Sequence, residues 1–70
     1  MVEDEKILKD LGNKFKKARE LANLKQTDVA EAAGLNANYY AQIERGEINL
    51  SVKKLQSIAK VLNIKSIDIE

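Results

Sequence analysis

The chain has 70 residues, contains neither cysteine nor histidine, and carries a formal net charge of only +1. One small domain is the expectation for this length, and the missing residue types exclude disulfides, thiolate metal sites and the most common general base of enzymes. No apolar run approaches the roughly 18 residues that cross a bilayer, and the charged start MVEDEKILKD is unlike a signal peptide, so we expect a cytoplasmic protein with no cofactor and no membrane partner.

The apolar residues in the first third of the chain recur at three- and four-residue steps, the spacing of one helix face. We therefore expect a helix over about residues 4–22, with residues 1–9 as a looser lead-in. Gly12 and Asn13 should weaken it locally, because glycine costs roughly 1 kcal/mol relative to alanine in a helix. The predicted buried stripe consists of Ile7, Leu8, Leu11, Phe15, Ala18 and Leu21 or Ala22.

Two shorter helices are predicted next, over residues 26–33 and 37–45. Gly34 stands where a left-handed residue would end the first of them, and Gly46 stands in the same place after the second. Asn36 is a favourable N-cap for the helix that follows it.

Ser51 is the predicted cap of a fourth helix. The segment 63–70 holds either one more turn or a frayed end, so we expect an all-α fold of four to five helices over residues 1–70. The apolar stripe of the fourth helix is Val52, Leu55, Ile58, Ala59 and Leu62.

Basic residues are concentrated in the middle of the chain. Residues 11–65 hold ten basic and five acidic residues, a net charge of +5, whereas residues 1–10 and 66–70 each have a net charge of −2. A solvated lysine surface and a surface for nucleic acid both fit this distribution.

The pair of helices over residues 26–45, joined by a tight turn at Gly34, has the arrangement of a helix-turn-helix. The chain also carries, in this order and spacing, Gln26, the Val29-Ala30 pair, Gly34-Leu35, the IERG of Ile43 to Gly46 and the IAKVL of the fourth helix. With these motifs the chain resembles, from about Leu11 to Ile64, the helix-turn-helix domain of the phage repressor and Cro (XRE) type. Its ERGEINLS segment is similar to the corresponding segment of restriction–modification controller proteins. The resemblance implies a compact bundle that binds operator DNA with the helix over residues 37–45 in the major groove.

Tyr39 and Tyr40 cannot both face the core, because successive helical residues diverge by about 100°. Tyr40 is three residues from Ile43 and is predicted to be buried with it. Tyr39 is therefore the outward tyrosine, which either reaches a phosphate or a thymine methyl group or only covers the seam between the two short helices.

Asn38 and Gln42 are four residues apart and share one helix face. Their amides can bind adenine bidentately, which is worth roughly 1–3 kcal/mol of discrimination each. Ala37 stands where relatives often carry a long polar side chain, so it offers only contact with a thymine methyl group. Asn36 has two candidate roles, helix cap and DNA contact, and we favour the cap.

The resemblance also implies contacts with the DNA backbone. In the family, the position of Gln26 hydrogen-bonds a phosphate, and Thr27 can assist. Arg45 either reaches DNA or caps the end of its helix. Lys53 and Lys54 are expected to approach the phosphates together with Asn49. The alternative for each lysine is a solvated surface charge.

Arg19 and Glu44 correspond to the charged pair that joins the first and third helices in this family. We interpret them as a structural clamp that holds the helix over residues 37–45 at its angle. This structural role is distinct from a contact with DNA.

These features predict a sequence-specific transcription regulator that binds double-stranded DNA as a homodimer. An enzyme is not expected, and no small-molecule effector site is evident. An antitoxin or a protein-interaction module with the same fold is the alternative. The expected dimer contact lies near the C-terminus and consists of Val61, Ile64, Ile67 and Ile69. In the alternative arrangement, Ile64 and Ile67 fold back onto the core of the monomer.

Overall fold

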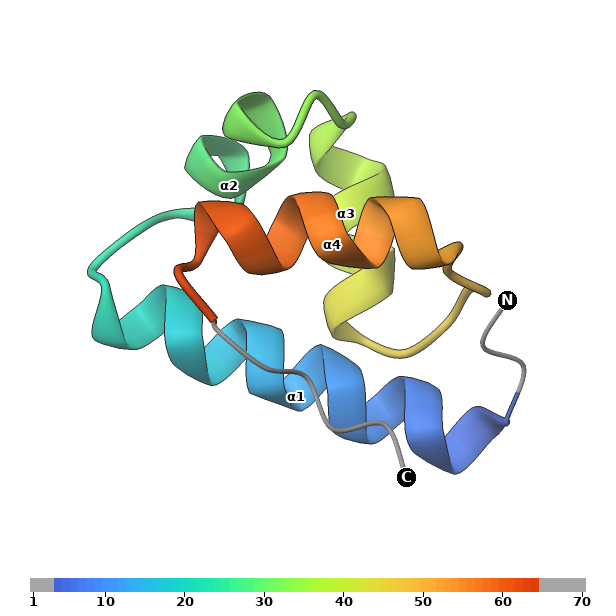
Figure 1. Ribbon diagram of the computed structural model, residues 1–70. Coiled ribbons are helices and arrows are strands. Elements are labelled where there is room, and N and C mark those ends of the chain that lie inside the picture. The colour runs from blue at the N-terminus through green and yellow to red at the C-terminus, as the bar shows by residue number, and fades with distance from the viewer. Residues whose placement is uncertain (1–3, 65–70) are drawn as a thin grey trace.

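The computed structural model describes residues 4–64, which form four α-helices joined by short turns (Figure 1). α1 lies along one side of the molecule, α3 packs on both α1 and α2, and α4 also contacts α2. The all-α prediction is confirmed. The additional turn, together with Ile67 and Ile69, falls outside the described residues. The helices are α1 (Glu5–Leu21), α2 (Gln26–Ala32), α3 (Ala37–Glu44) and α4 (Val52–Val61).

α1 begins at Glu5, inside the segment 1–9 that was expected to be a looser lead-in. The Asp4 carboxylate accepts hydrogen bonds from the backbone N–H groups of Lys6 and Ile7, at 2.9 and 3.2 Å. Leu8 is buried one turn into the helix. The lead-in prediction is therefore wrong for residues 5–9, because an N-cap and a buried leucine together fix this first turn.

Gly12 does not interrupt α1, which continues through it. The residue is buried against the end of α3, and a Cβ atom added there would lie 2.6 Å from the Ile43 carbonyl oxygen and closer still to that of Glu44. The glycine lets the backbones of two helices touch, so its low helix propensity is offset by this packing.

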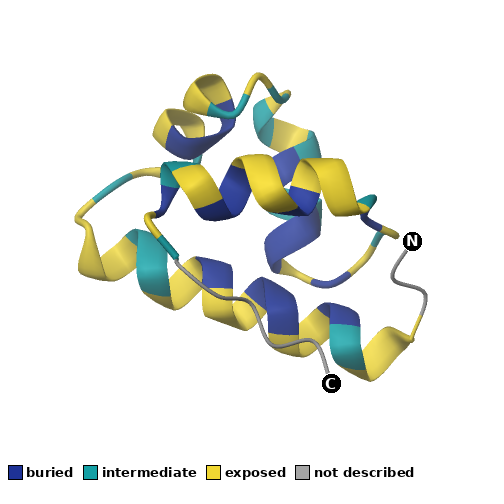
Figure 2. Cartoon of the chain, in the orientation of Figure 1, coloured by how far each residue is buried: buried dark blue, intermediate teal, exposed yellow. Residues whose placement is uncertain are grey.

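The inward faces of all four helices meet in one core (Figure 2). Val52 departs from the predicted stripe, because it begins α4 on the outer side and is 55% exposed, and Leu21 departs likewise at 89%. The apolar stripe of α1 therefore ends at Ala18, which packs against the core. The five largest fully buried side chains are Tyr40, Phe15, Leu50, Ile58 and Val29.

The predicted stop and cap residues position α3 and α4. Gly34 and Gly46 adopt φ values of +72° and +71°, the left-handed conformation that glycine enters without strain. Asn36 caps α3 by accepting hydrogen bonds from two backbone N–H groups, at 2.8 and 3.3 Å. Ser51 caps α4 through the N–H of Lys54, at 3.2 Å. These local signals fix where the outward face of α3 starts and ends.

Candidate nucleic-acid interface

α3 buries one tyrosine and presents the other at its border. Tyr40 is fully buried, whereas Tyr39 is half-buried, as the sequence predicted. Asn38 is exposed, and Gln42 is half-buried one turn further on. Ala37 is half-buried at the start of the same face. This face therefore offers small side chains and amides, with no large apolar residue.

The predicted clamp between Arg19 and Glu44 is present and largely buried. The Arg19 guanidinium donates two hydrogen bonds to the Glu44 carboxylate, at 2.7 and 3.1 Å, and a third to the Leu24 carbonyl oxygen at 3.0 Å. The two side chains are only 12% and 2% exposed. A planar guanidinium that grips a carboxylate with two parallel bonds fixes direction as well as distance, so α3 is held at a set angle to α1.

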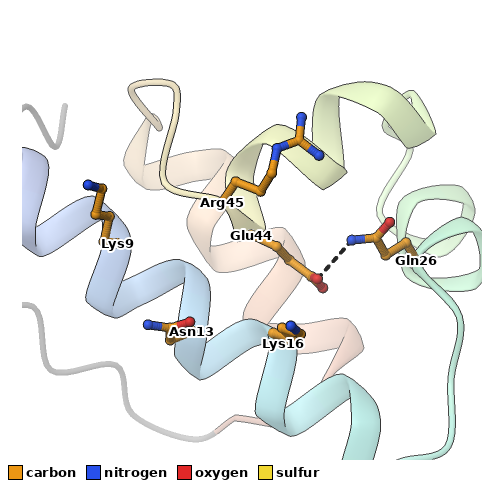
Figure 3. Close-up of a pocket in the computed structure, with 6 residues that line it drawn as sticks. All are labelled: Lys9, Asn13, Lys16, Gln26, Glu44 and Arg45. Carbon is orange, nitrogen blue, oxygen red and sulfur yellow. Dashed lines mark hydrogen bonds between the residues drawn. The ribbon is translucent and has the colours of Figure 1, made fainter.

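A third side chain joins this clamp. The Gln26 amide nitrogen donates a hydrogen bond of 2.9 Å to the Glu44 carboxylate, as Figure 3 shows. An ionised carboxylate only accepts hydrogen bonds, so the amide must turn its nitrogen toward Glu44. One of its two N–H groups is thereby used, and the other remains for a ligand. Sequence reasoning placed Gln26 at the interface but missed this contact.

The clamp changes the acidity of the buried groups. Burial alone would raise the pKa of the Glu44 carboxyl, but hydrogen bonds from Arg19 and Gln26 outweigh burial and hold that pKa below its ordinary value. The hydrogen bond to Glu44 raises the pKa of Arg19. Burial, followed by the neighbouring Glu44 carboxylate, raises the pKa of the Tyr40 phenol. Glu44 is therefore ionised at neutral pH.

The Tyr40 hydroxyl itself is buried and forms no hydrogen bond of ordinary geometry within residues 4–64. It lies near enough to the Glu44 carboxylate for that charge to act on its pKa. The phenol ring fills the core beneath the clamp.

Tyr39 and Lys54 form a pair that connects α3 to the first turn of α4. The Lys54 ammonium donates a hydrogen bond of 3.1 Å to the Tyr39 hydroxyl and lies 4.7 Å from the centre of its ring. Cation–π contacts at exposed sites contribute roughly 0.5–1 kcal/mol. The sequence predicted both residues separately as DNA contacts, and the fold brings them together.

The remaining predicted contacts lie on the surface. Thr27, Asn49 and Lys53 are all exposed. Arg45 is exposed as well, and its guanidinium donates to the Glu47 carboxylate at 2.8 and 3.1 Å. This pairing was not anticipated. The hydrogen bond that Arg45 donates to Glu47 raises the pKa of Arg45, and an exposed pair of this kind contributes little to stability.

Lys25 is the N-cap residue of α2, and its side chain makes no capping hydrogen bond. Its backbone N–H donates to the Asp28 carboxylate at 2.8 Å. This is one half of a capping box, so the Asp28 side chain fixes the backbone at the start of α2.

The short helices α2 and α3, joined at Gly34 and locked by a buried ion pair, define a helix-turn-helix domain. The chain belongs to the helix-turn-helix family, whose sequence profile matches residues 15–69. The resemblance to the phage repressor and Cro type is thereby confirmed.

Three relatives show where in the family the chain stands. It is 39% identical over 56 residues to the ImmF control region 10 kDa protein of Bacillus phage phi105, covering 80% of this chain and 62% of that protein. It is 36% identical over 55 residues to the Immunity repressor protein of the same phage, covering 79% of this chain and 38% of that protein. It is 41% identical over 54 residues to Control protein C.MunI of Mycoplasma sp, covering 76% of this chain and 73% of that protein. The chain thus spans about three fifths of the length of the ImmF control region protein and about two fifths of the length of the immunity repressor.

In residues 4–64, no helix combines the length and the apolar composition needed to cross a membrane.

Proposed function

We propose that the protein is a sequence-specific, DNA-binding transcription regulator that inserts α3 into the major groove of operator DNA. The observation that carries this proposal is the buried clamp of Arg19, Gln26 and Glu44, because it fixes α3 while leaving its amide-bearing face outward. A rigidly held helix with polar side chains fits the major groove, which admits one α-helix. Asn38 and Gln42 are the proposed base-reading residues.

The DNA backbone is contacted on both sides of α3 in this proposal. Gln26 and Thr27, at the start of α2, meet phosphates on one side. Asn49 and Lys53, together with the Lys54–Tyr39 pair, meet them on the other, beside the start of α4. Phosphate contacts of this kind set the position of the protein on the duplex, whereas contacts with base edges carry the sequence information.

A homodimer completes the proposal. One domain of this size reads too few base pairs for useful selectivity, and helix-turn-helix proteins commonly bind two half-sites one helical turn apart. Val61 and Ile64 are half-buried at the edge of the core. They are the described part of the proposed dimer contact.

Selection of binding sites from random DNA, followed by measurement of affinity against salt, tests the function. We expect an enriched half-site repeated with two-fold symmetry, and an affinity that falls steeply with salt as phosphate contacts are lost. Enrichment of no sequence would refute specific readout. Affinity that does not depend on salt would refute DNA binding and favour the alternative of a protein-interaction module.

A further inference from the structure

An open hollow lies beside the end of α3, and side chains from three helices line it (Figure 3). All of them except Glu44 carry hydrogen-bond donors. α1 contributes half of the lining, although none of its residues there belongs to the interface described above. The lining consists of Lys9, Asn13 and Lys16 from α1, Gln26 from α2, and Glu44 and Arg45 from the end of α3.

The α1 row, by which we mean Lys9, Asn13 and Lys16, lies on one helix face because its members are four and three residues apart. It extends over about 10.5 Å along the helix axis, at 1.5 Å per residue. Gly12 fixes the row beside α3, since it packs directly on the carbonyl groups of Ile43 and Glu44. The backbone of the row therefore has a set position relative to the end of α3.

The charges of the hollow favour an anion. Glu44 is the one acidic side chain in its lining, and that carboxylate is already bonded to Arg19. Lys9 lies 3.9 Å from Glu5 in a solvent-exposed pair, which competes weakly with a phosphate. Lys16 forms no ion pair within residues 4–64. Lys16 is thus the strongest cation of the row.

We propose that the α1 row is an additional DNA contact that binds phosphodiester oxygens of the strand running past Gln26. This inference rests on the proposed function, which places Gln26 against a phosphate, and Gln26 shares the hollow with the row. Each DNA strand carries one phosphate per ~3.4 Å of duplex axis. A row about 10.5 Å long therefore suits a chain of phosphates better than a single small anion.

The row would bind DNA without reading its sequence. Lysine is a point charge for a phosphate, and an asparagine amide donates one neutral hydrogen bond. The contact should therefore act equally on operator and random DNA, and it should fix how α1 lies over the backbone next to the groove that α3 occupies.

Salt titrations of Lys9→Ala and Lys16→Ala test the row, with a short random-sequence duplex and with the selected operator. Each lost phosphate contact should reduce the slope of log affinity against log salt by about 0.9, which corresponds to about eightfold weaker binding near 0.1 M salt. Lys17→Ala is the matched control, because Lys17 is an exposed lysine of the same helix that does not line the hollow. It should bind as the unmodified protein does.

A gain of binding provides an independent arm. Asn13→Lys adds a third cation to the row and should steepen the salt slope by about one unit on both DNAs. All four substituted positions are exposed, so far-UV circular dichroism should show unchanged helix content in each variant.

Three results would overturn the inference. If Lys9→Ala and Lys16→Ala match Lys17→Ala while the unmodified protein binds DNA with a steep salt dependence, the α1 row is a solvated surface and the proposed function stands. If Asn13→Lys leaves the slope unchanged, no phosphate lies at the row. Failure of the unmodified protein to bind any duplex would remove both the inference and the proposed function.

Discussion

Replacing Arg19 with methionine should destabilise the fold severely. The substitution keeps a long unbranched side chain but removes the N–H groups that reach the Glu44 carboxylate at 2.7 and 3.1 Å. Glu44 is only 2% exposed, so its charge would stay out of water with Gln26 as its remaining strong donor. Breaking a buried pair in this way costs about 3–5 kcal/mol.

The size of this loss can be set against the whole stability of the domain. At roughly 0.05–0.15 kcal/mol per residue, a chain of this length has a free energy of unfolding of about 3.5–10 kcal/mol. Arg19→Met should therefore remove at least about a third of that free energy. Urea unfolding followed by far-UV circular dichroism measures the difference between the two proteins.

Two further variants identify the cause of the loss. Lys17→Met changes an exposed residue of the same helix and should alter stability by less than about 0.5 kcal/mol. The double substitution Arg19→Met with Glu44→Leu removes both charges and should recover much of the loss, because apolar replacement of a whole buried pair is often neutral. A loss below about 1 kcal/mol for Arg19→Met, the value typical of exposed pairs, would refute the buried clamp. A double variant no more stable than the single one would assign the loss to packing.

Four other outcomes are expected. The folded-state pKa of Glu44 lies below its ordinary value of 4.5. The stability due to the clamp should therefore be complete above the unfolded-state pKa and decline as pH falls below about 4.5. Urea midpoints measured at decreasing pH should show this decline in the unmodified protein and a smaller one in Arg19→Met. Gly12→Ala should lower the thermal midpoint, although alanine favours helix, because its Cβ would lie 2.6 Å from a carbonyl oxygen of α3; a higher midpoint would mean that the two helices separate freely. Tyr40→Phe should leave the free energy of unfolding in urea unchanged or raise it, because the substitution removes a buried hydroxyl without a hydrogen bond. A decrease of more than about 1 kcal/mol would instead indicate a hydrogen bond between the Tyr40 hydroxyl and the Glu44 carboxylate. Asn38→Ala and Gln42→Ala should each weaken operator binding by about 1–3 kcal/mol and spare random DNA; equal losses on both DNAs, measured by fluorescence anisotropy, would make them backbone contacts.

The sequence predicted the elements of this fold wherever a local rule applied. Gly34 and Gly46 stop their helices, and Asn36 and Ser51 cap the next ones, because each of these acts on its own neighbours. The same rule was available for Asp4, but a looser lead-in was expected over residues 1–9 instead. A cap followed by buried Leu8 shows that charged surroundings do not prevent a stable first turn.

Contacts between elements could not be predicted in the same way. Gln26 and Glu44 are 18 residues apart, and Tyr39 and Lys54 are 15 residues apart. Their pairing depends on the angles at which helices cross, which no local pattern encodes. Gly12 is the clearest case, since its low helix propensity suggested weakness until the carbonyl groups of α3 were found against it.

Glu44 connects the stability of the domain to the geometry of its proposed interface. One carboxylate holds Arg19 from α1 and Gln26 from α2, and it belongs to the last turn of α3. Because a carboxylate only accepts hydrogen bonds, its charge also decides which end of the Gln26 amide turns inward. A substitution at Glu44 would therefore alter the fold, the angle of α3 and a proposed phosphate contact together. Base readout is better probed at Asn38, an exposed residue outside this network.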